Sequence, residues 1–544
     1  MNFKETLKKT LHLPQTKFSI NNLNHLVVEE KIRNFWSENE IYKKNLSKNS
    51  QKSSFILHSG PTYANGKIHC GHVLNYVLKD IIVRFFSKDN YSPFILGWDA
   101  HGLPIEHKVL QNNKSFGLEL RKLCKDFSEK QVSNQRDQLK KLGIFTDYDC
   151  YYSTASKEYE AEQIRAFGKI VENGVIYRGL RPIHWSWTHE TALAENEIEY
   201  IDKKDKSIFF KVLIKDSFNL FNKEKVHLLA WTTQPWTVPA NRLIAIKSSA
   251  HYSLVELDNE FLIILNSKID LLKKSSDKEF NPKILETFLG KKIEGLSYVN
   301  CYNEESGSTI VSDDDLVNEN EGTGIVHIAP EFGSEDFSLA KRKNLVIESS
   351  MLPSGFFRKK VGSDFSEKHF QEVNLMVIED LKRRKILFRE KEIIHSYPHD
   401  WRDKSPLIYR LTEQWFIDLK KVKKEIIDSI EKVEWYPDWT KTKIENSIKS
   451  RQDWCISRQR VWGLPIPVLY NEGEPILNGE IINFIADIFE SNGVDCWFNG
   501  EILPILRSKF PKILGDKSVL GKDIMDVWFD SGVSHWCVLD KEKL

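Results

Sequence analysis

The sequence predicts an α/β protein that is built on a parallel sheet and interrupted by an inserted, mainly β region. Two strand-to-helix transitions near the N-terminus predict the parallel sheet, and a run of short β-rich segments between residues 201 and 390 predicts the insertion. With 544 residues, the chain exceeds the usual size of one domain. Its formal net charge is only +1, so a polyanionic partner would have to meet local clusters of Lys and Arg.

The first predicted α/β unit begins at the apolar segment FILHSG, which reads as a short buried strand ending in a Gly turn. The segment from His72 then places Val73, Val77 and Ile81 on one line of a helix. A second apolar run, SPFILGWDAHG, ends in the same way. It would place Asp99 at the carboxyl end of a strand, where parallel sheets bind their ligands.

The pattern changes again near residues 200 and 390. Between them lie short β-rich runs such as IFFKVLI and VHLLAWTT, separated by Lys-rich turns. We therefore expect three regions: residues 1–200, with an N-terminal helix and the first half of the α/β domain; residues 201–390, the inserted domain; and residues 391–544, the second part of the split domain.

Cysteine usage and the N-terminus indicate the cellular compartment. The seven cysteines are scattered without a CxxC pair, which is typical of reduced thiols. The stretch MNFKETLKKTLHLPQTKF carries charges throughout and lacks the apolar core of a signal peptide. We expect a cytoplasmic protein with no membrane contact.

Two imidazoles, His69 and His72, flank Gly71 at the start of the first predicted helix. The amides at a helix N-terminus attract phosphate, and imidazoles donate hydrogen bonds to phosphate oxygens as charge develops on them. Gly71 would leave room for a flat base against the backbone. The spacing suits an ATP site, although in isolation it fits an ordinary polar helix start at least as well.

Taken together, the motifs resemble those of the class I aminoacyl-tRNA synthetases. HCGH is similar to the HIGH motif of that family and GWDAHGLPIE to its amino-acid pocket strand, and SYPHDWRDKSP, QWFIDL, DWCISRQRVWGLPIPV and DVWFDSG follow in the family's order. The wording of these motifs resembles the isoleucine members, because the valine members lack GWDxHGLP and the leucine members continue with FGLPAE.

This resemblance implies a Rossmann-like catalytic domain, interrupted by an editing domain, that carries out the isoleucine–tRNA ligase reaction. ATP with Mg²⁺ activates isoleucine, which is then transferred to tRNA(Ile). Isoleucine, ATP and tRNA(Ile) are the implied partners, and we expect a monomer. His69 and His72 would be catalytic, and the implied ATP-binding residues are Gly60, Pro61, Thr62, Tyr63, Asn65, Gly66, His69, Cys70, Gly71 and His72.

The resemblance also assigns an amino-acid pocket made by Pro61, Asp99 and Trp528. Asp99 would pair with the substrate ammonium, and Trp528 would pack against the branched side chain. The alternatives are an Asp that caps the following turn and a Trp that belongs to the ordinary core.

An apolar pocket distinguishes isoleucine from valine by one methylene, worth about 1–3 kcal/mol, a value known from the isoleucine enzymes themselves. Accurate charging therefore needs a hydrolytic editing site. In the family this site uses the segments that correspond here to WTTQPWTVPAN and GTGIVHIAPEFGSEDF. The implied editing residues are Thr232, Thr233, Asn241, His327 and Asp336.

Each editing residue has an implied role. Asp336 would hold the ammonium of misattached valine, the hydroxyls of Thr232 and Thr233 would face the terminal ribose or a water, and His327 would exclude isoleucine by its bulk. The family usually has a third Thr where this chain has Gln234. A larger amide there would change how water or the terminal adenosine is held, and the alternative is an insertion that binds tRNA but hydrolyses slowly.

We expect no metal site in this sequence. HWSWTHETALAENEIEY lies where some relatives carry a Cys-rich zinc knuckle, but Ser186, Trp187 and His189 supply no tetrahedral ligand set. His395 and His399 are four positions apart, yet Pro398 between them excludes a plain helix.

After DVWFDSG the family pattern continues with an adenylate-binding strand, the KMSKS loop and a helical anticodon-binding domain, none of which occurs in these residues. We expect this polypeptide alone to have little or no adenylation activity, because the Lys of that loop neutralises the ATP phosphates. One alternative is a module that edits or binds the tRNA acceptor end. Another is a nucleotidyltransferase that shares HxGH without acting on tRNA.

Overall fold

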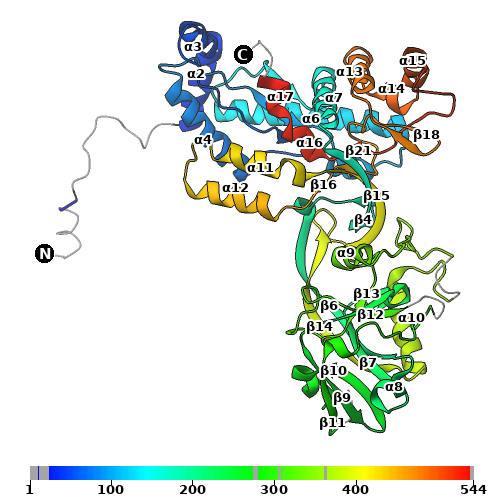
Figure 1. The fold of residues 1–544 in the computed structure, drawn as a ribbon. Helices are drawn as coiled ribbons and strands as arrows, with labels where there is room; N and C mark the ends of the chain where they lie inside the picture. The colour runs from blue at the N-terminus through cyan, green and yellow to red at the C-terminus, as the bar shows by residue number, and fades with distance from the viewer. Residues whose placement is uncertain (1–9, 12–23, 274–279, 304–307, 360–363, 540–544) are drawn as a thin grey trace. The chain divides into compact units, whose positions relative to one another are not determined.

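The computed structural model describes residues 10–11, 24–273, 280–303, 308–359 and 364–539 (Figure 1). Most of the charged N-terminal stretch MNFKETLKKTLHLPQTKF lies outside these residues. The chain divides into two compact units. Unit 1 comprises residues 1–101, 105–163 and 530–544, and unit 2 comprises residues 102–104 and 164–529.

Unit 1 contains the predicted parallel sheet, with the strand order β1-β2-β3. Helix α4 connects β1 to β2, and α6 runs between β2 and β3, so the strands stay parallel through helical crossovers. Buried Leu96 and Trp98 of β2 pack with Val83 and Leu139 from these helices. The elements are β1 (Thr62–Tyr63), β2 (Leu96–Asp99), β3 (Tyr151–Ser153), α2 (His25–Glu38), α3 (Ile41–Asn49), α4 (Cys70–Phe86), α6 (Gly117–Leu142) and α17 (Ser534–Leu539).

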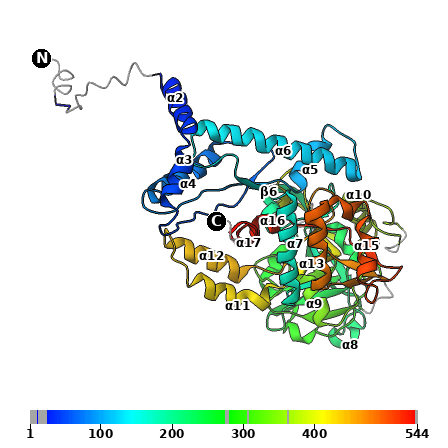
Figure 2. The same ribbon diagram turned by 90° about the horizontal axis from the view of Figure 1, so that it is seen from above.

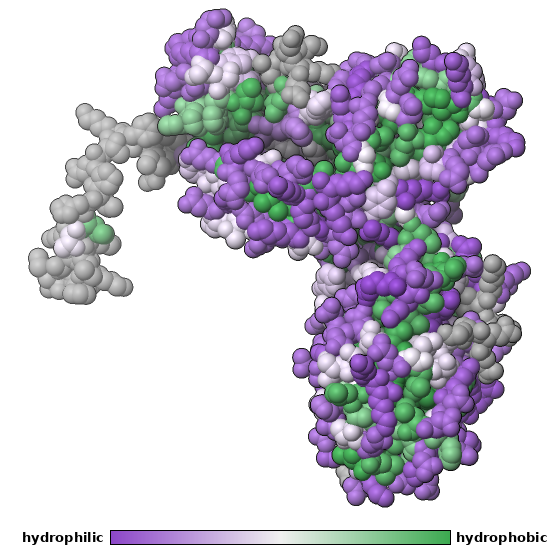
Figure 3. Space-filling model, viewed as in Figure 1, coloured by the Kyte–Doolittle hydropathy of each residue, from purple (hydrophilic) through white to green (hydrophobic). Residues whose placement is uncertain are grey.

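Helix α4 shows how sequence pattern and burial differ. The apolar line predicted from His72 does lie on one helix, but the residues that α4 buries are Tyr76 and Val83. Leu74 and Phe85 on that helix are 64% and 65% exposed. Figure 3 shows apolar side chains gathered beside α2 and α4 on an otherwise largely hydrophilic face.

The predicted mainly β insertion lies in unit 2 as a nine-stranded sheet with the order β11-β9-β10-β7-β13-β8-β12, extended by β6 on β7 and by β14 on β6. Its core includes Ile208, Leu228, Ile244 and Ile263, and helix α10 adds Leu381. The bounds are β6 (Ile198–Leu213), β7 (Val226–Thr232), β8 (Leu243–Ile246), β9 (His251–Leu257), β10 (Glu260–Leu265), β11 (Lys283–Leu289), β12 (Thr309–Ser312), β13 (Val326–Ile328), β14 (Leu387–Asp400), α9 (Ser334–Arg342) and α10 (Phe370–Arg383).

The insertion begins and ends on two antiparallel strands, β6 and β14, which form a two-stranded ribbon. Strands β6 and β14 are antiparallel, and their register runs from Ile198 opposite Asp400 to Phe210 opposite Leu387. The expected boundaries at residues 200 and 390 fall within these two strands. The predicted fold class, a parallel α/β sheet interrupted by a mainly β insertion, is confirmed.

The rest of unit 2 joins a second, smaller sheet to helices. Its long pair is β4 against β15, and β16 and β5 lie at the sheet edges. Helices α11 and α12 lie side by side in both views (Figure 2). The bounds are β4 (Ile176–Ser186), β5 (Thr191–Ala192), β15 (Ile408–Ile417), β16 (Trp454–Cys455), β17 (Ser457–Arg458), β21 (Ile524–Met525), α11 (Leu419–Ile430), α12 (Trp439–Ser450) and α13 (Gly479–Asn492). The chain passes from one unit to the other within α7 (Lys157–Glu172), after Gln163, and within α16 (Val527–Gly532), after Phe529.

Within the described ranges, no helix combines the length and the apolar composition that a membrane crossing needs.

Candidate functional site

The HCGH segment forms the start of α4, as predicted. His69 is the N-cap residue, and its Nδ1 accepts a hydrogen bond from the Gly71 amide at 3.1 Å. The Nδ1 of His72 accepts from the His69 amide at 3.3 Å, and the two rings stack with centroids 3.9 Å apart. Because each Nδ1 is an acceptor, the neutral rings carry their protons on Nε2. Burial, with the neighbouring His69 ring, lowers the pKa of His72.

Gly71 is fixed by the cap itself. A Cβ at this position would lie 3.0 Å from Cε1 of His69, so a larger residue would push the capping imidazole. The side chains of His69 and Cys70 are exposed, and His72 is half-buried. The helix start therefore presents two Nε2–H donors at the positive end of the helix dipole, which suits an anion.

The segment before α4 is held by Gln135 of α6, which the sequence did not predict. Gln135 of α6 donates its amide to the carbonyl oxygens of Tyr63 at 3.0 Å and Gly66 at 2.7 Å. Thr62 Oγ1 lies 2.6 Å from the hydroxyl of Tyr76 in α4. Gly60 and Asn65 are exposed, and no atom lies within 4 Å of a Cβ built at Gly60 or Gly66. No local pattern marks Gln135, because its partners lie about 70 residues earlier in the chain.

Asp99 ends β2, as predicted, and its carboxylate is buried. Its Oδ2 accepts a hydrogen bond from Ser531 Oγ at 2.7 Å, and its Oδ1 lies 3.4 Å from Thr154 Oγ1. Burial and the neighbouring carboxylate of Asp530 raise the pKa of Asp99. The carboxylate also has a hydrogen bond with the backbone of His101, two residues further on, so the turn-capping alternative stays open.

The other two residues predicted for the amino-acid pocket, Pro61 and Trp528, lie in different units. Pro61 is half-buried in unit 1, just before β1. Trp528 belongs to unit 2, where its side chain is 47% exposed, which removes the alternative of an ordinary core Trp. Its role as a wall of the amino-acid pocket stays a prediction.

The residues before Trp528 are anchored by a buried ion cluster in unit 2. Arg458, from the WCISRQR segment, donates to Asp526 Oδ2 at 2.7 Å and lies 3.3 Å from Glu197 Oε2. The indole of Trp454 also donates to Asp526 at 2.9 Å. Through Arg458, the WCISRQR segment thus ties β17 to the DVWFDSG segment.

The predicted editing residues come from neighbouring strands of the insertion. Strand β7 ends at Thr232 and pairs with β13, which contains His327. Thr232 Oγ1 accepts a hydrogen bond from the amide of Gln234 at 3.0 Å. The Gln234 side chain accepts from the indole of Trp236 at 2.7 Å. Gln234, which stands where the family usually has a third Thr, therefore contacts the buried Trp236.

His327 is buried and held on both sides. Asn241 Nδ2 donates to its Nδ1 at 2.9 Å, so the ring proton lies on Nε2 and is donated to Thr237 Oγ1 at 2.9 Å. Asn241 in turn accepts from the hydroxyl of Tyr298 at 2.6 Å. Burial lowers the pKa of His327 to about 4, so the ring is neutral at pH 7. Thr237 and Tyr298 were missed by the sequence analysis.

Asp336 lies in the first turn of α9. Its Oδ2 accepts a hydrogen bond from the Ala329 amide at 2.7 Å, two residues beyond His327. Burial outweighs this hydrogen bond and raises the pKa of Asp336 to about 6. The structure thus ties Asp336 to the β13 end that carries His327, while the hydroxyl of Thr233 has no role that the hydrogen bonds define.

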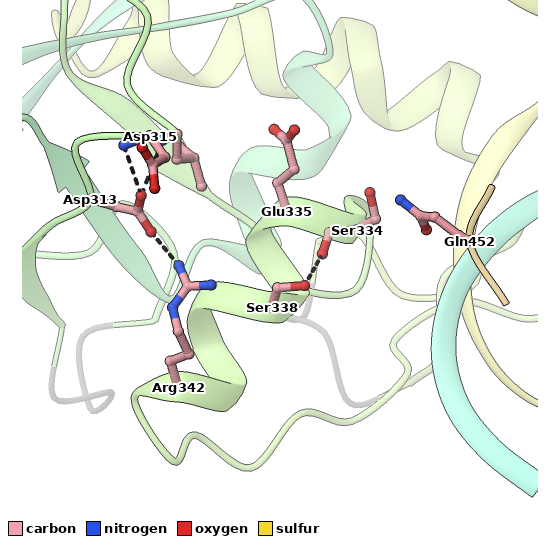
Figure 4. A pocket seen from close by; sticks show the side chains of 8 residues that line it. Asp313, Asp315, Ser334, Glu335, Ser338, Arg342 and Gln452 are labelled. Carbon is pink, nitrogen blue, oxygen red and sulfur yellow. Dashed lines mark hydrogen bonds and ion pairs between the residues drawn. The ribbon is translucent and has the colours of Figure 1, made fainter. Parts of the chain in front are cut away.

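Two cavities flank these residues. One of about 520 Å³ is lined by Asn241, Arg242 and Glu331 together with residues 346–350. The other, of about 540 Å³, is lined by Glu335 and Ser338 of α9 and by the paired Arg342 and Asp313 (Figure 4). The first adjoins the His327 network through Asn241, and the second receives no residue predicted for editing.

His189 has neighbours that the sequence did not suggest. Its Nδ1 lies 3.4 Å from Asp400 and 3.7 Å from Asp403, and the three ligand atoms lie within 4.8 Å of one another. Thr188 also contacts Asp403 at 3.1 Å. The two aspartates were missed because they lie more than 200 positions along the chain. The absence of a zinc site stays a prediction.

The comparisons with known proteins agree with these motifs. The chain is 42% identical to the isoleucine–tRNA ligase of Caldanaerobacter subterraneus subsp. tengcongensis and 40% identical to that of Pediococcus pentosaceus, in each case over 98% of this chain and 58% of the relative. It therefore spans somewhat more than half the length of these curated relatives.

Among solved structures, the LeuRS of the Agrobacterium radiobacter K84 agnB2 LeuRS-tRNA-LeuAMS ternary complex is 16% identical, with a TM-score of 0.40 over 94% of this chain and 60% of that chain. This likeness is too low to support a conclusion. The family described as tRNA synthetases class I (I, L, M and V) matches residues 31–543. Because that match covers almost the whole chain, the chain belongs to this family of class I tRNA synthetases.

Proposed function

We propose that this chain provides the isoleucine-binding and ATP-binding portion of an isoleucine–tRNA ligase, together with a hydrolytic site that removes misattached valine. The observation that carries the first part is the start of α4, where His69 and His72 present Nε2–H donors at a helix N-terminus. ATP would enter with Mg²⁺, and its phosphates would meet these donors. Asp99, buried at the end of β2, would receive the substrate ammonium.

The editing part rests on the His327 network. A neutral, doubly hydrogen-bonded imidazole is a fixed wall, which suits size exclusion better than proton transfer. Asp336 is tied to the same strand end, because its Oδ2 accepts a hydrogen bond from the Ala329 amide, and it would bind the valine ammonium. We also propose tRNA(Ile) as the partner, a monomeric state and a cytoplasmic location.

Deacylation of valyl-tRNA(Ile) tests the editing proposal. The wild-type chain should hydrolyse valyl-tRNA faster than isoleucyl-tRNA, and Asp336→Ala should abolish this activity. Glu335→Ala is the matched control, because Glu335 is the adjacent residue of α9 and lines the 540 Å³ cavity (Figure 4), which no residue predicted for editing lines. Equal rates for wild type and Asp336→Ala would refute the editing role.

Isoleucine-dependent pyrophosphate exchange tests the adenylation part. The 544-residue polypeptide tested alone should show little exchange, because its sequence contains no KMSKS loop. Deacylation without exchange would favour the second candidate, a module that edits or binds the acceptor end. Normal turnover would contradict the expectation that these residues are incomplete for adenylation.

A further inference from the structure

Two consecutive residues near the end of the chain hold the end of strand β2. Asp530 Oδ2 accepts a hydrogen bond from His101 Nδ1 at 2.7 Å, and Ser531 Oγ donates to Asp99 Oδ2 at 2.7 Å. All four residues belong to unit 1. His101 and Asp530 are each 1% exposed. The orientation of the Asp99 carboxylate is therefore coupled to the contact between His101 and Asp530.

His101 lies between two carboxylates. Besides Asp530 at its Nδ1, its Nε2 lies 3.3 Å from Glu160 Oε1 in α7. Two carboxylates beside the two ring nitrogens favour the form of the ring that carries both protons. Burial alone would lower the pKa of His101, but the hydrogen bonds with Asp530 and Glu160 raise it to about 9. His101 is therefore an imidazolium at neutral pH.

The remaining contacts of Asp530 keep it in place for this role. Gln163 Nε2 donates to its Oδ1 at 2.7 Å, and the hydroxyl of Tyr159 donates to its backbone carbonyl at 2.6 Å. Both carboxylate oxygens are thus engaged. A change at His101 would leave Asp530 in position with its negative charge less compensated.

The titratable groups around Asp99 come from several elements. Burial and the Asp530 carboxylate disfavour ionisation of Asp99, whereas the Ser531 hydrogen bond and the His101 charge favour it. The phenols of Tyr152 and Tyr159 stay neutral, because burial raises the pKa of both. The facing groups are His101, Tyr152 of β3, Tyr159 and Glu160 of α7, Asp530 of α16 and Cys537 of α17.

We propose that His101 is a positioning residue of the amino-acid site: as a buried imidazolium it holds Asp530 and Ser531 and lowers the cost of ionising Asp99 when a substrate ammonium binds. This inference rests on the proposed role of Asp99. It differs from that role because His101 would touch no substrate atom. Its effect reaches the ligand through the charge and orientation of the Asp99 carboxylate.

The inference predicts a selective loss of affinity for cations. A charge next to a carboxyl changes its pKa by about 1 to 3, and each pKa unit is a tenfold change in the ionised fraction. His101→Gln keeps a hydrogen-bond donor toward Asp530 but removes the charge. We expect this variant to bind a cationic ligand about 10- to 100-fold more weakly at pH 7.

The test compares two ligands on the 544-residue chain by calorimetry. Isoleucinol carries the side chain and the ammonium, and 3-methyl-1-pentanol carries the same side chain without the amine. His101→Gln should weaken isoleucinol 10- to 100-fold, leave the alcohol within about twofold, and move the rise of isoleucinol affinity to higher pH. His535→Gln, an exposed histidine in the same C-terminal segment, is the matched control and should change neither ligand.

The other outcomes are decisive in different ways. Equal weakening of both ligands, or an unchanged pH profile, would show a merely structural role and overturn the inference while leaving Asp99 as the ammonium site. If the wild type does not prefer isoleucinol over the alcohol, the proposed amino-acid site fails and the inference fails with it. If His101→Gln does not fold, ¹⁵N-histidine spectra of the wild type decide, since a neutral His101 ring at pH 7 would overturn the proposal.

Discussion

Replacing Arg458 with Met should destabilise the region where β17 meets β21. The substitution leaves the carboxylates of Asp526 and Glu197 buried, at 1% and 4% exposure, without their shared guanidinium. Breaking a buried ion pair from one side costs about 3–5 kcal/mol. We expect the lower end of that range. Asp526 keeps its hydrogen bond from the indole of Trp454 at 2.9 Å, and Glu197 keeps its ion pair with Arg402.

Hydrogen exchange measures this loss locally, since β17 and β21 pair through Ser457 and Met525. A loss of about 3 kcal/mol in local stability corresponds to about 150-fold faster exchange of these amides. The matched control is Arg383→Met, whose ion pair with Asp380 is largely exposed on the Arg side, so this change should leave the exchange of these amides nearly unchanged. Acceleration of less than about fivefold in Arg458→Met would refute the reasoning.

The pH dependence supplies an internal check on the same variant. Burial raises the pKa of Asp526, and Arg458 opposes this effect. Without Arg458 the pKa should rise further, so Asp526 would take up a proton more readily. The exchange difference between variant and wild type should therefore be smaller at pH 5 than at pH 8.

Three further changes test other parts of the molecule. Burial raises the pKa of Asp336 to about 6, so the stability linked to this group is present below about pH 4 and is lost as pH rises through about 6. Asp336→Asn should therefore raise the thermal unfolding midpoint more at pH 7.5 than at pH 4.5. His327→Ala should cost about 1–3 kcal/mol more than His327→Gln in urea unfolding, because Asn241 loses its acceptor; equal costs would contradict the network. Gly97→Ala should destabilise unit 1, since its Cβ would lie 2.0 Å from Cζ of Tyr152, and the double variant with Tyr152→Ala should recover part of the loss in thermal unfolding.

Local sequence patterns predicted the parts of the site that depend on neighbouring residues. The cap of α4 follows from His69 and His72, which lie within one turn, and Asp99 follows from the end of an apolar strand. The mainly β insertion follows from its short apolar runs. In each case the determining residues are adjacent in the chain, so their spacing carries the information.

The missed residues act across long separations. His101 meets Asp530 at a distance of 429 positions, and Asn241 meets Tyr298 at 57. Nothing near Gln135, Thr237 or Ser531 distinguishes them from other polar residues, because their partners are set by the packing of separate elements. The burial of α4 could not be predicted either, since its apolar line does not indicate which side meets the sheet.

The paired ribbon of β6 and β14 has a consequence for the order in which the chain can fold. The contact between His101 and Asp530 closes a segment of 429 positions. Lys203 and His395 face each other across the ribbon, so once the insertion has formed, about 190 of those positions no longer add length to the segment. By the logarithmic dependence of loop entropy this shortening is worth only about 0.5 kcal/mol. Its larger effect is on timing. The insertion can finish folding during synthesis before Ser531 is made, so the contact between Ser531 and Asp99 at the end of β2 forms later.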